Sequence, residues 1–277
     1  MFCTLRSLAV LALTVTTAAV GCVGNDESDG TDDEVVVDSE SNLSAPAFQA
    51  DATPPSYADI ERLTGDAFKS AIFDRIKNHR GLGYNTARKQ MFARTAEGFQ
   101  NEHGKLECVY TGREVDPTGS TAAGGFNTEH SWPQSMGAKN EPAKSDLHHL
   151  FPVDNRANSV RGNWPFGEPG CAADTTGTSG HCSFGEGGSY MGKDSNNRNV
   201  FQVREEKRGD IARAHFYFAV RYNLHIPNTE EAVLRQWNDE DPVDAIELRR
   251  NAAIQALQNN RNPFVDRPDF VAKIADY

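Results

Sequence analysis

The sequence lacks an excess of basic residues, a long apolar run and any Cys-x-x-Cys motif. With 28 Lys and Arg against 39 Asp and Glu, its formal net charge is −11, so the chain as a whole has no strong positive field to attract a polyanion. The apolar run at residues 8–20 is shorter than the ~20 residues that cross a membrane as a helix. The missing Cys-x-x-Cys pairs argue against a zinc-stabilised fold.

The N-terminus instead predicts export. One basic residue, Arg6, precedes the apolar run, and small residues follow it, which is typical of a signal peptide over residues 1–22. The run Ala19-Val20-Gly21-Cys22 resembles a lipoprotein processing site, after which Cys22 would be the acylated N-terminal residue. The alternative is ordinary signal cleavage near Ala18 or Ala19, with Cys22 left as a spare thiol. We therefore expect an exported protein, either secreted or lipid-anchored at the cell envelope.

Residues 23–56 predict a disordered acidic spacer. They contain nine acidic residues and no Lys or Arg, and such a segment cannot bury enough apolar surface to fold. The spacer would hold the following domain away from a membrane. Because it carries nine negative charges and Arg6 one positive charge, a net charge of −3 remains for residues 57–277. That domain is nearly neutral, so it would bind a polyanion through a few local Lys and Arg contacts.

The cysteines of the domain predict one disulfide. Cys171 and Cys182 lie on either side of a segment rich in Gly, Thr and Ser, and in an exported protein this favours a disulfide that closes the loop. Zinc binding by His181, Cys182 and a distant partner is the alternative. Cys108 lies in an apolar strand predicted at residues 106–110, and we expect it to be buried and unpaired.

Apolar spacing predicts the helical scaffold. Three stripes with helical periodicity occur, at Phe68-Ile72-Ile76, at Ile211-Ala214-Phe218-Tyr222 and at Val243-Ile246-Ala253-Ile254-Leu257. Asp241 is expected to cap the third helix, with Pro242 at its first position. The glycine-rich residues 167–192 are expected to form a long surface loop. The chain of ~220 residues after the spacer is best interpreted as a single α+β domain.

Three short segments carry candidate chemistry, at residues 127–130, 146–150 and 158–164. Glu129 supplies a charged oxygen and Asn158 a neutral one, which suits Mg²⁺ because this ion prefers oxygen ligands and keeps several of its own waters. The side chain of His130 has an ordinary pKa of about 6.5 and can take a proton near neutral pH. A hard cation and a histidine base are what phosphodiester hydrolysis requires.

The spacing of these residues constrains their geometry. Neighbours on a regular strand point to opposite faces, so Glu129 and His130 could share a site only where the strand ends or bulges, and Pro133 makes such an end plausible. Asn158 and Arg161 are three residues apart and would share one face of a helix, where a metal-bound phosphate could meet both.

The longest motifs together resemble the endonuclease I family of secreted bacterial nucleases, which carry a ββα-metal (His-Me) finger, and especially its extracellular ribonuclease-like branch. The resemblance covers roughly residues 65–270 and is specific, because several long motifs occur in the right order. It is carried by residues 108–113, 125–135, 144–152, 158–167, 207–222, 241–245 and 262–264.

The resemblance implies a fold and a set of roles. The fold would be an α+β domain at residues 57–277, with the ββα-metal finger at its core and helices around it. His130 would be the general base, with Glu129 and Asn158 as ligands of Mg²⁺, while Mn²⁺ or Ca²⁺ remain open as the working ion. Arg161 ranks first by spacing for the contact to the product phosphate.

Two basic residues, Lys139 and Lys144, are the other candidates for that contact. The implied activity is a metal-dependent, largely sequence-nonspecific endonuclease that acts on DNA, RNA or both and leaves 5′ phosphates. We infer no protein partner and expect a monomer. One competing class is a surface-anchored binding module that keeps an inactive finger as structure.

A structural zinc protein that uses His148, His149 and His181 is the other competing class. Consecutive histidines on a strand face opposite ways, so at most one of His148 and His149 is expected to point into the site, and hydrogen bonding to neighbours is expected of them more than metal ligation. Trp132 and Trp164 could stack on bases, but packing beneath the finger is the expectation for both.

Overall fold

The structure, a computed structural model, describes residues 53–94, 97–173 and 181–277. The predicted signal peptide and nearly all of the predicted acidic spacer lie outside these residues, so both stay predictions. Within the described ranges, no helix has the length and apolar character that crossing a membrane requires.

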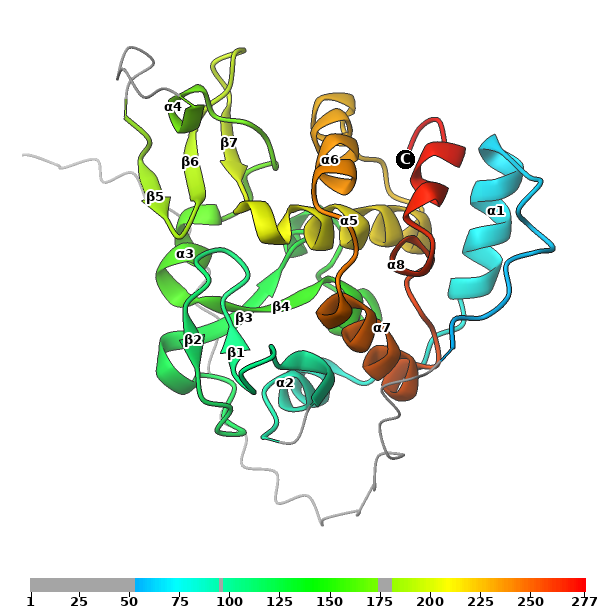
Figure 1. Ribbon diagram of the computed structural model, residues 1–277, viewed down its shortest axis with the longest axis horizontal. Helices are drawn as coiled ribbons and strands as arrows, with labels where there is room; N and C mark the ends of the chain where they lie inside the picture. Colours follow the sequence, from blue (N-terminus) through cyan, green and yellow to red (C-terminus); the bar gives the residue numbers. More distant parts are fainter. Residues whose placement is uncertain (1–52, 95–96, 174–180) are drawn as a thin grey trace, which may run out of the picture. The chain divides into compact units, whose positions relative to one another are not determined.

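Helices and small antiparallel sheets make up the described residues, which confirms the predicted α+β class (Figure 1). The helices are α1 (Gly65–Ile76), α2 (Tyr84–Met91), α3 (Asn155–Arg161), α4 (Gly170–Ala173), α5 (Arg208–Tyr222), α6 (Asn228–Glu240), α7 (Ala245–Gln258) and α8 (Pro263–Asp266). The strands are β1 (Leu106–Glu107), β2 (Glu114–Val115), β3 (Phe126–His130), β4 (Leu150–Asp154), β5 (Phe184–Glu186), β6 (Ser189–Lys193) and β7 (Asn199–Gln202). Their sheets have the orders β1-β2, β3-β4 and β5-β6-β7.

The pair β3 and β4 with the helix α3 forms the ββα unit that the motif order predicts. The strands are antiparallel, and their register pairs Phe126 with Asp154 and His130 with Leu150. Asp154 ends β4 and caps α3, because its carboxylate accepts a hydrogen bond from the backbone N–H of Arg156. Gly162 ends α3 with a positive φ of 50°, a conformation that glycine adopts without strain.

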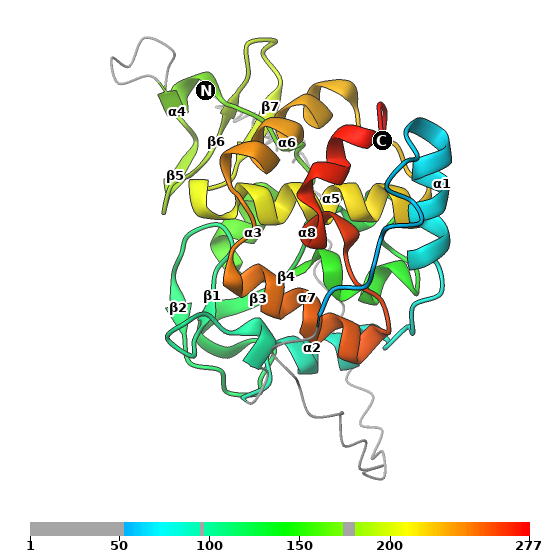
Figure 2. The same cartoon turned by 45° about the vertical axis from the view of Figure 1, so that its right-hand side comes forward.

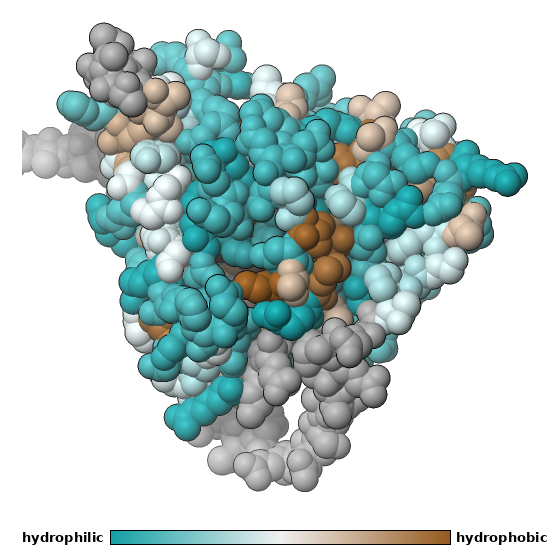
Figure 3. Space-filling view, in the orientation of Figure 1, coloured by the Kyte–Doolittle hydropathy of each residue, from teal (hydrophilic) through white to brown (hydrophobic). Residues whose placement is uncertain are grey.

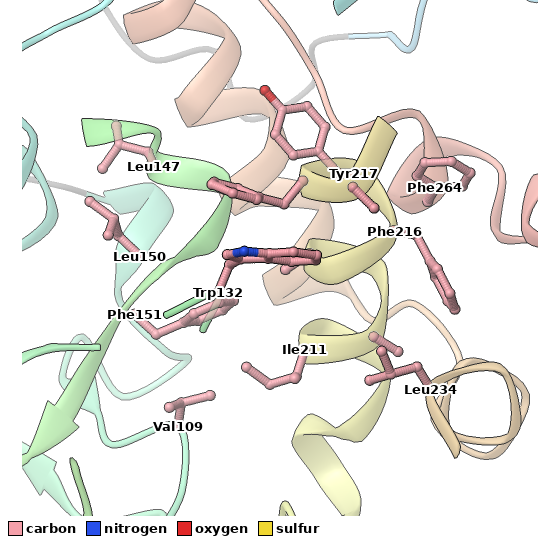
Figure 4. Packing of buried hydrophobic residues seen from close by; sticks show 14 of the residues in the cluster. Val109, Trp132, Leu147, Leu150, Phe151, Ile211, Phe216, Tyr217, Leu234 and Phe264 are labelled. Carbon is pink, nitrogen blue, oxygen red and sulfur yellow. The ribbon is translucent and has the colours of Figure 1, made fainter. Parts of the chain in front are cut away.

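Helix α5 lies across the middle of the described unit, between the β3-β4 hairpin and helices α6 and α8 (Figures 1 and 2). The second predicted helix is confirmed as α5, and every residue from 211 to 220 is buried, so its packing extends beyond the predicted stripe to all sides. Figure 4 shows Trp132 and Phe151 on the hairpin side and Ile211 and Tyr217 on α5, packed against each other. The face drawn in Figure 3 is mostly hydrophilic, with apolar side chains gathered in one small central area.

The first predicted helix is confirmed, whereas the start of the third is wrong. Phe68, Ile72 and Ile76 are all buried on α1. Asp241 does not cap α7, because its carboxylate accepts a hydrogen bond from the backbone N–H of Gly209 at the start of α5. The cap of α7 is Asp244, which accepts from the backbone N–H of Glu247. Gly209, which is distant in sequence, thus bonds the Asp241 carboxylate that the local pattern predicts as the cap of α7.

The expected surface loop at residues 167–192 is partly wrong. β5 and β6 form an antiparallel hairpin there, connected by Gly187 and Gly188 with φ values of 58° and 87°. Two consecutive residues with positive φ match the tight turn that a two-residue hairpin requires.

The predicted disulfide between Cys171 and Cys182 is confirmed. Cys108 is free and buried, as expected, and its sulfur accepts from two backbone N–H groups, although β1 is shorter than the predicted strand.

A buried polar cluster centred on Asp146 joins the loop before β4 to α5 and α7. The side chain of Asp146 is fully buried. One carboxylate oxygen accepts from the hydroxyls of Tyr217 and Tyr222, at 2.8 and 2.9 Å. The other accepts from the amide of Gln258 at 3.0 Å and from the backbone N–H of His148 at 3.1 Å. This carboxylate therefore satisfies donors from three segments that are far apart in sequence.

Replacing Asp146 by alanine should lower the free energy of unfolding by about 3–5 kcal/mol, because several buried donors lose their acceptor together. Urea denaturation of the Asp146→Ala variant measures this loss. Asp116→Ala is the matched control, since 78% of the Asp116 side chain is exposed, and it should change stability by less than about 0.5 kcal/mol. Equal denaturation midpoints for the two variants would contradict the structural role of Asp146.

Candidate active site

His130 lies at the last position of β3 with its ring fixed by neighbouring groups. Its Nε2 atom is 3.1 Å from the backbone carbonyl oxygen of Lys144. A carbonyl only accepts hydrogen bonds, so Nε2 carries the proton and Nδ1 of the neutral ring keeps the lone pair. The amide nitrogen of Gln134 is 3.5 Å from Nδ1, and the rings of Tyr84 and His149 have their centres 5.2 and 5.3 Å from that of His130.

Glu129, the preceding residue of β3, has a buried carboxylate with partners from two other segments. The hydroxyl of Tyr110 donates to its Oε1 atom at 2.6 Å, and Nε of Arg161 is 3.4 Å from the same oxygen. Burial raises the pKa of Glu129 above its ordinary value, while Arg161 and the Tyr110 hydrogen bond act against that rise. Both contacts are made to Oε1, which leaves Oε2 as the oxygen available to a cation.

The amide of Asn158 faces the same strand from α3. Its Nδ2 atom donates to the side-chain oxygen of Asn127 at 2.8 Å and to the backbone carbonyl of Thr128 at 3.3 Å. These bonds fix the orientation of the amide and direct its carbonyl oxygen away from them. Hydrogen bonds thus orient both Glu129 and Asn158, and their oxygens are of the kind that a hard divalent cation prefers.

Arg161, one turn further along α3, is buried and occupied by protein partners. Its guanidinium donates to the backbone carbonyls of Ser131 at 2.6 Å and Gly162 at 2.8 Å, and it lies over the ring of Phe166. Asn158 and Arg161 therefore both point towards β3, as their spacing predicts. The contact to a product phosphate stays a prediction, and the contacts of Arg161 favour a role in holding the carboxylate of Glu129.

Lys139 and Lys144, the other candidates for the contact to the product phosphate, differ in position. Lys139 is exposed, and Lys144 is partly buried beside His130.

Trp132 packs between His215 and Phe218, with ring centres 5.3 Å from each, so the expected packing role is confirmed for this residue.

The packing role expected of Trp164 is wrong. The residue follows α3 and its turn, and it is 43% exposed. Its backbone N–H bonds the carbonyl of Arg161 in the turn after α3, and buried packing resumes only at Phe166.

Tyr110 was not singled out by the sequence analysis. Its signal was present, because the residue lies within the matching segment 108–113, but nothing in that segment indicates its partner. The ring packs against Phe201 of β7, with centres 4.8 Å apart, and this contact directs the hydroxyl to Glu129.

The zinc alternatives gain no support from the geometry. Cys182 is bonded to Cys171, which removes it as a ligand. His149 Nε2 is 2.9 Å from the carbonyl of Ala143, and the ring of His148 packs on Tyr217. Over the described ranges, no group of three or more His, Cys, Asp or Glu residues comes close enough to hold a metal.

Three histidines close to the site are buried in their neutral form. Burial lowers the pKa of His148 to about 3. Burial and the charge of Arg161 lower the pKa of His215 to about 3. Burial and the neighbouring His130 also lower the pKa of His149 well below its ordinary value. All three regain an ordinary pKa near 6.5 when the chain unfolds.

These three histidines should therefore destabilise the fold as the pH drops below about 6.5, because the unfolded chain takes up three protons that the folded chain excludes until well below that pH. Their stabilising contribution is complete above pH 6.5, and at pH ~5 they should add about 4 kcal/mol per pH unit to the slope of stability against pH. Urea denaturation between pH 7.5 and 4.5 measures it. The variant His215→Gln should show a slope about one third smaller, and a flat profile between pH 6.5 and 5 would contradict the assignment.

Comparison with known proteins assigns this chain to a family. A family model described as Endonuclease I matches residues 64–269. The chain is 32% identical over 256 residues to the extracellular ribonuclease of Bacillus subtilis (strain 168). This match covers 84% of this chain and 82% of that protein. It is 31% identical over 242 residues to the extracellular ribonuclease of Bacillus amyloliquefaciens, covering 80% and 78%.

A shorter match joins the chain to an extracellular deoxyribonuclease of Aeromonas hydrophila. The two are 31% identical over 124 residues, which cover 45% of this chain and 50% of that protein. The family that the motifs resemble, and the extent of about 65–270 expected from them, are confirmed. The chain belongs to the endonuclease I family.

Proposed function

We propose that the protein is an exported, divalent-metal-dependent endonuclease that hydrolyses phosphodiester bonds in DNA, RNA or both, with little sequence specificity, and leaves 5′-phosphate products. Membership of the endonuclease I family supports nuclease activity. The observation that supports the finer proposal is that Glu129 and the neutral His130 are the last two residues of β3, while the amide of Asn158 donates to the Thr128 carbonyl of the same strand.

Glu129 and Asn158 would hold the metal through Oε2 and Oδ1, and Mg²⁺ fits this pair of hard oxygen donors best. When bound, the metal supplies positive charge that stabilises the charge developing on the phosphoryl oxygens. Tyr110 and Arg161 both contact Oε1 of Glu129, so they orient the carboxylate and offset the cost of burying its charge.

His130 would act as the general base through Nδ1. Water attacks the phosphorus atom and its proton passes to Nδ1, while the bond from phosphorus to the 3′ oxygen breaks. The 3′ oxygen takes a proton from a second water molecule and leaves as a hydroxyl, so the phosphate stays on the 5′ side. The Lys144 carbonyl accepts the proton on Nε2, so it orients the ring and stabilises the imidazolium that forms. Arg161 remains a candidate for contact with the product phosphate, although its present partners favour a positioning role.

A general base and a metal ligand should lose different properties when each is replaced by alanine. His130→Ala should lower turnover on plasmid DNA or total RNA by about 10²–10⁴-fold and keep its affinity for Mn²⁺, because only proton transfer is removed. Glu129→Ala should lose both turnover and Mn²⁺ affinity. Kinetics with and without chelator, beside calorimetric titration of Mn²⁺, separate these outcomes.

His103→Ala is the matched control for His130→Ala, since 61% of the His103 side chain is exposed. It should leave turnover and Mn²⁺ affinity unchanged. Wild-type affinity for Mn²⁺ in Glu129→Ala would refute the ligand assignment, and full activity in the presence of chelator would refute metal dependence.

The extracellular location of the named relatives supports export. We further propose that Cys22 is acylated after signal cleavage, so that the acidic spacer connects the nuclease domain to a lipid anchor. Both segments lie outside the described residues, and the proposal depends on the sequence pattern.

Full-length precursor made in a Gram-negative host should partition into detergent and gain the mass of acyl chains. Cys22→Ser should release a soluble protein that lacks the added mass. Phase partition and intact-mass measurement test both statements. Identical partition of the two proteins would leave simple secretion as the explanation.

A further inference from the structure

Two cations lie around one aromatic ring beside His130. Tyr84 is the first residue of α2, and the Lys144 ammonium is 4.8 Å from its ring centre, while the Arg88 guanidinium carbon is 5.2 Å from it. Lys144 lies on a 3-10 turn, residues Ala143–Ser145, which packs against α2. An aromatic face attracts a cation, so Tyr84 holds both positive groups in place.

Within the described residues, neither cation forms an ion pair. No carboxylate of these residues lies within 4.0 Å of the charged nitrogens of Lys144 or Arg88, and Nε of Arg88 has no hydrogen-bond partner among them. Glu141 is the acidic neighbour, but its two oxygens accept from the backbone N–H of Tyr84 and the hydroxyl of Ser145.

The absence of a counter-ion has an electrostatic consequence. Since both distances are measured to the same ring centre, the two charges are at most about 10 Å apart, close to one Debye length (~8–10 Å at physiological ionic strength). At this separation the charges of Lys144 and Arg88 repel each other, and an anion bound to both relieves the repulsion. The guanidinium of Arg88, which is only partly buried as a residue, offers such an anion charge-assisted hydrogen bonds.

The position of this pair relates it to the proposed reaction centre. The ring of Tyr84 is 5.2 Å from that of His130, and the backbone carbonyl of Lys144 accepts from His130 Nε2. A nucleic acid strand carries a phosphate at every nucleotide. With the scissile phosphate at His130, a neighbouring phosphate of the same strand comes within reach of the two cations.

We propose that Lys144 and Arg88 form a subsite that binds a non-scissile phosphate of the substrate strand, with Tyr84 as its support. This inference rests on the proposed nuclease function and adds to it a determinant of substrate length. It also fits a domain with a net charge of −3, in which a few local contacts must supply the attraction to a polyanion.

The test compares Lys144→Gln and Arg88→Gln with Lys89→Gln, an exposed neighbour on the same helix. None of these changes removes the backbone carbonyl that holds His130. Two readouts are used: binding of a fluorescent single-stranded oligonucleotide without divalent metal, and kinetics on a dinucleotide with one phosphodiester against a hexanucleotide. Thermal unfolding of each variant checks that the fold is retained.

We expect Lys144→Gln and Arg88→Gln each to weaken oligonucleotide binding by about 3–10-fold at low salt. The slope of log affinity against log salt should become shallower by about 0.7, the value for one lost contact to a single strand. KM for the hexanucleotide should rise while kcat stays unchanged, and the dinucleotide should show no change. Lys144→Arg should restore binding, and Lys89→Gln should match the wild type.

Two outcomes would overturn the subsite. One is an unchanged salt slope and hexanucleotide KM in Lys144→Gln and Arg88→Gln, and the other is an equal loss in Lys89→Gln, which would indicate unspecific attraction. Both leave the proposed nuclease function intact. If the wild type cleaves neither substrate, the nuclease proposal fails, and the binding measurement without metal still decides whether the two cations contact phosphate.

Discussion

A carboxylate removed from water must find donors or opposite charge, and at Glu129 this requirement connects three separate segments of the chain. Tyr110 reaches the carboxylate from the segment after β1, and Arg161 reaches it from α3. Because burying an unpaired carboxylate costs several kcal/mol, the three segments can pack only in an arrangement that brings these groups together. The same arrangement places Asn158 next to β3 and so assembles both proposed ligands.

Buried acceptors around the site are also satisfied by donors from distant segments. Asp146 gathers two tyrosine hydroxyls and a glutamine amide beneath the strand β4, while His149 and His215 each contact a backbone carbonyl. Ser131, the residue after His130, receives hydrogen bonds at its carbonyl from both Arg161 and His215. The end of β3 is therefore held by polar contacts on several sides, and such rigid support is what proton transfer by His130 requires.

Charge is distributed so that the site does not depend on the field of the whole protein. Most of the net negative charge, −9 of −11, comes from residues 23–56, and the remaining domain is close to neutral. Many of its basic side chains are paired with carboxylates, as Arg213 is with Glu247 in the core. Lys144 and Arg88 instead lie around the ring of Tyr84 beside His130, where the proposed subsite would attract phosphate locally. Weak overall attraction with strong local contacts suits an enzyme that must release its product.

The sequence by itself determined the family, the α+β class, the order of the ββα motifs, the first helix and the disulfide between Cys171 and Cys182. These follow from local information, since residue type, spacing and motif order are all properties of the linear chain. It also predicted that Asn158 and Arg161 share a face, because helical periodicity is local as well.

Contacts between distant residues were decided only by the tertiary structure. The sequence did not show that Tyr110 would meet Glu129, that Asp241 would bond Gly209 instead of capping α7, or that Trp164 would be exposed. Each depends on how α3, α5 and β7 pack against residues far away in the chain. Partners in such contacts are selected by burial and by the need to satisfy buried donors and acceptors, and neither is encoded in local spacing.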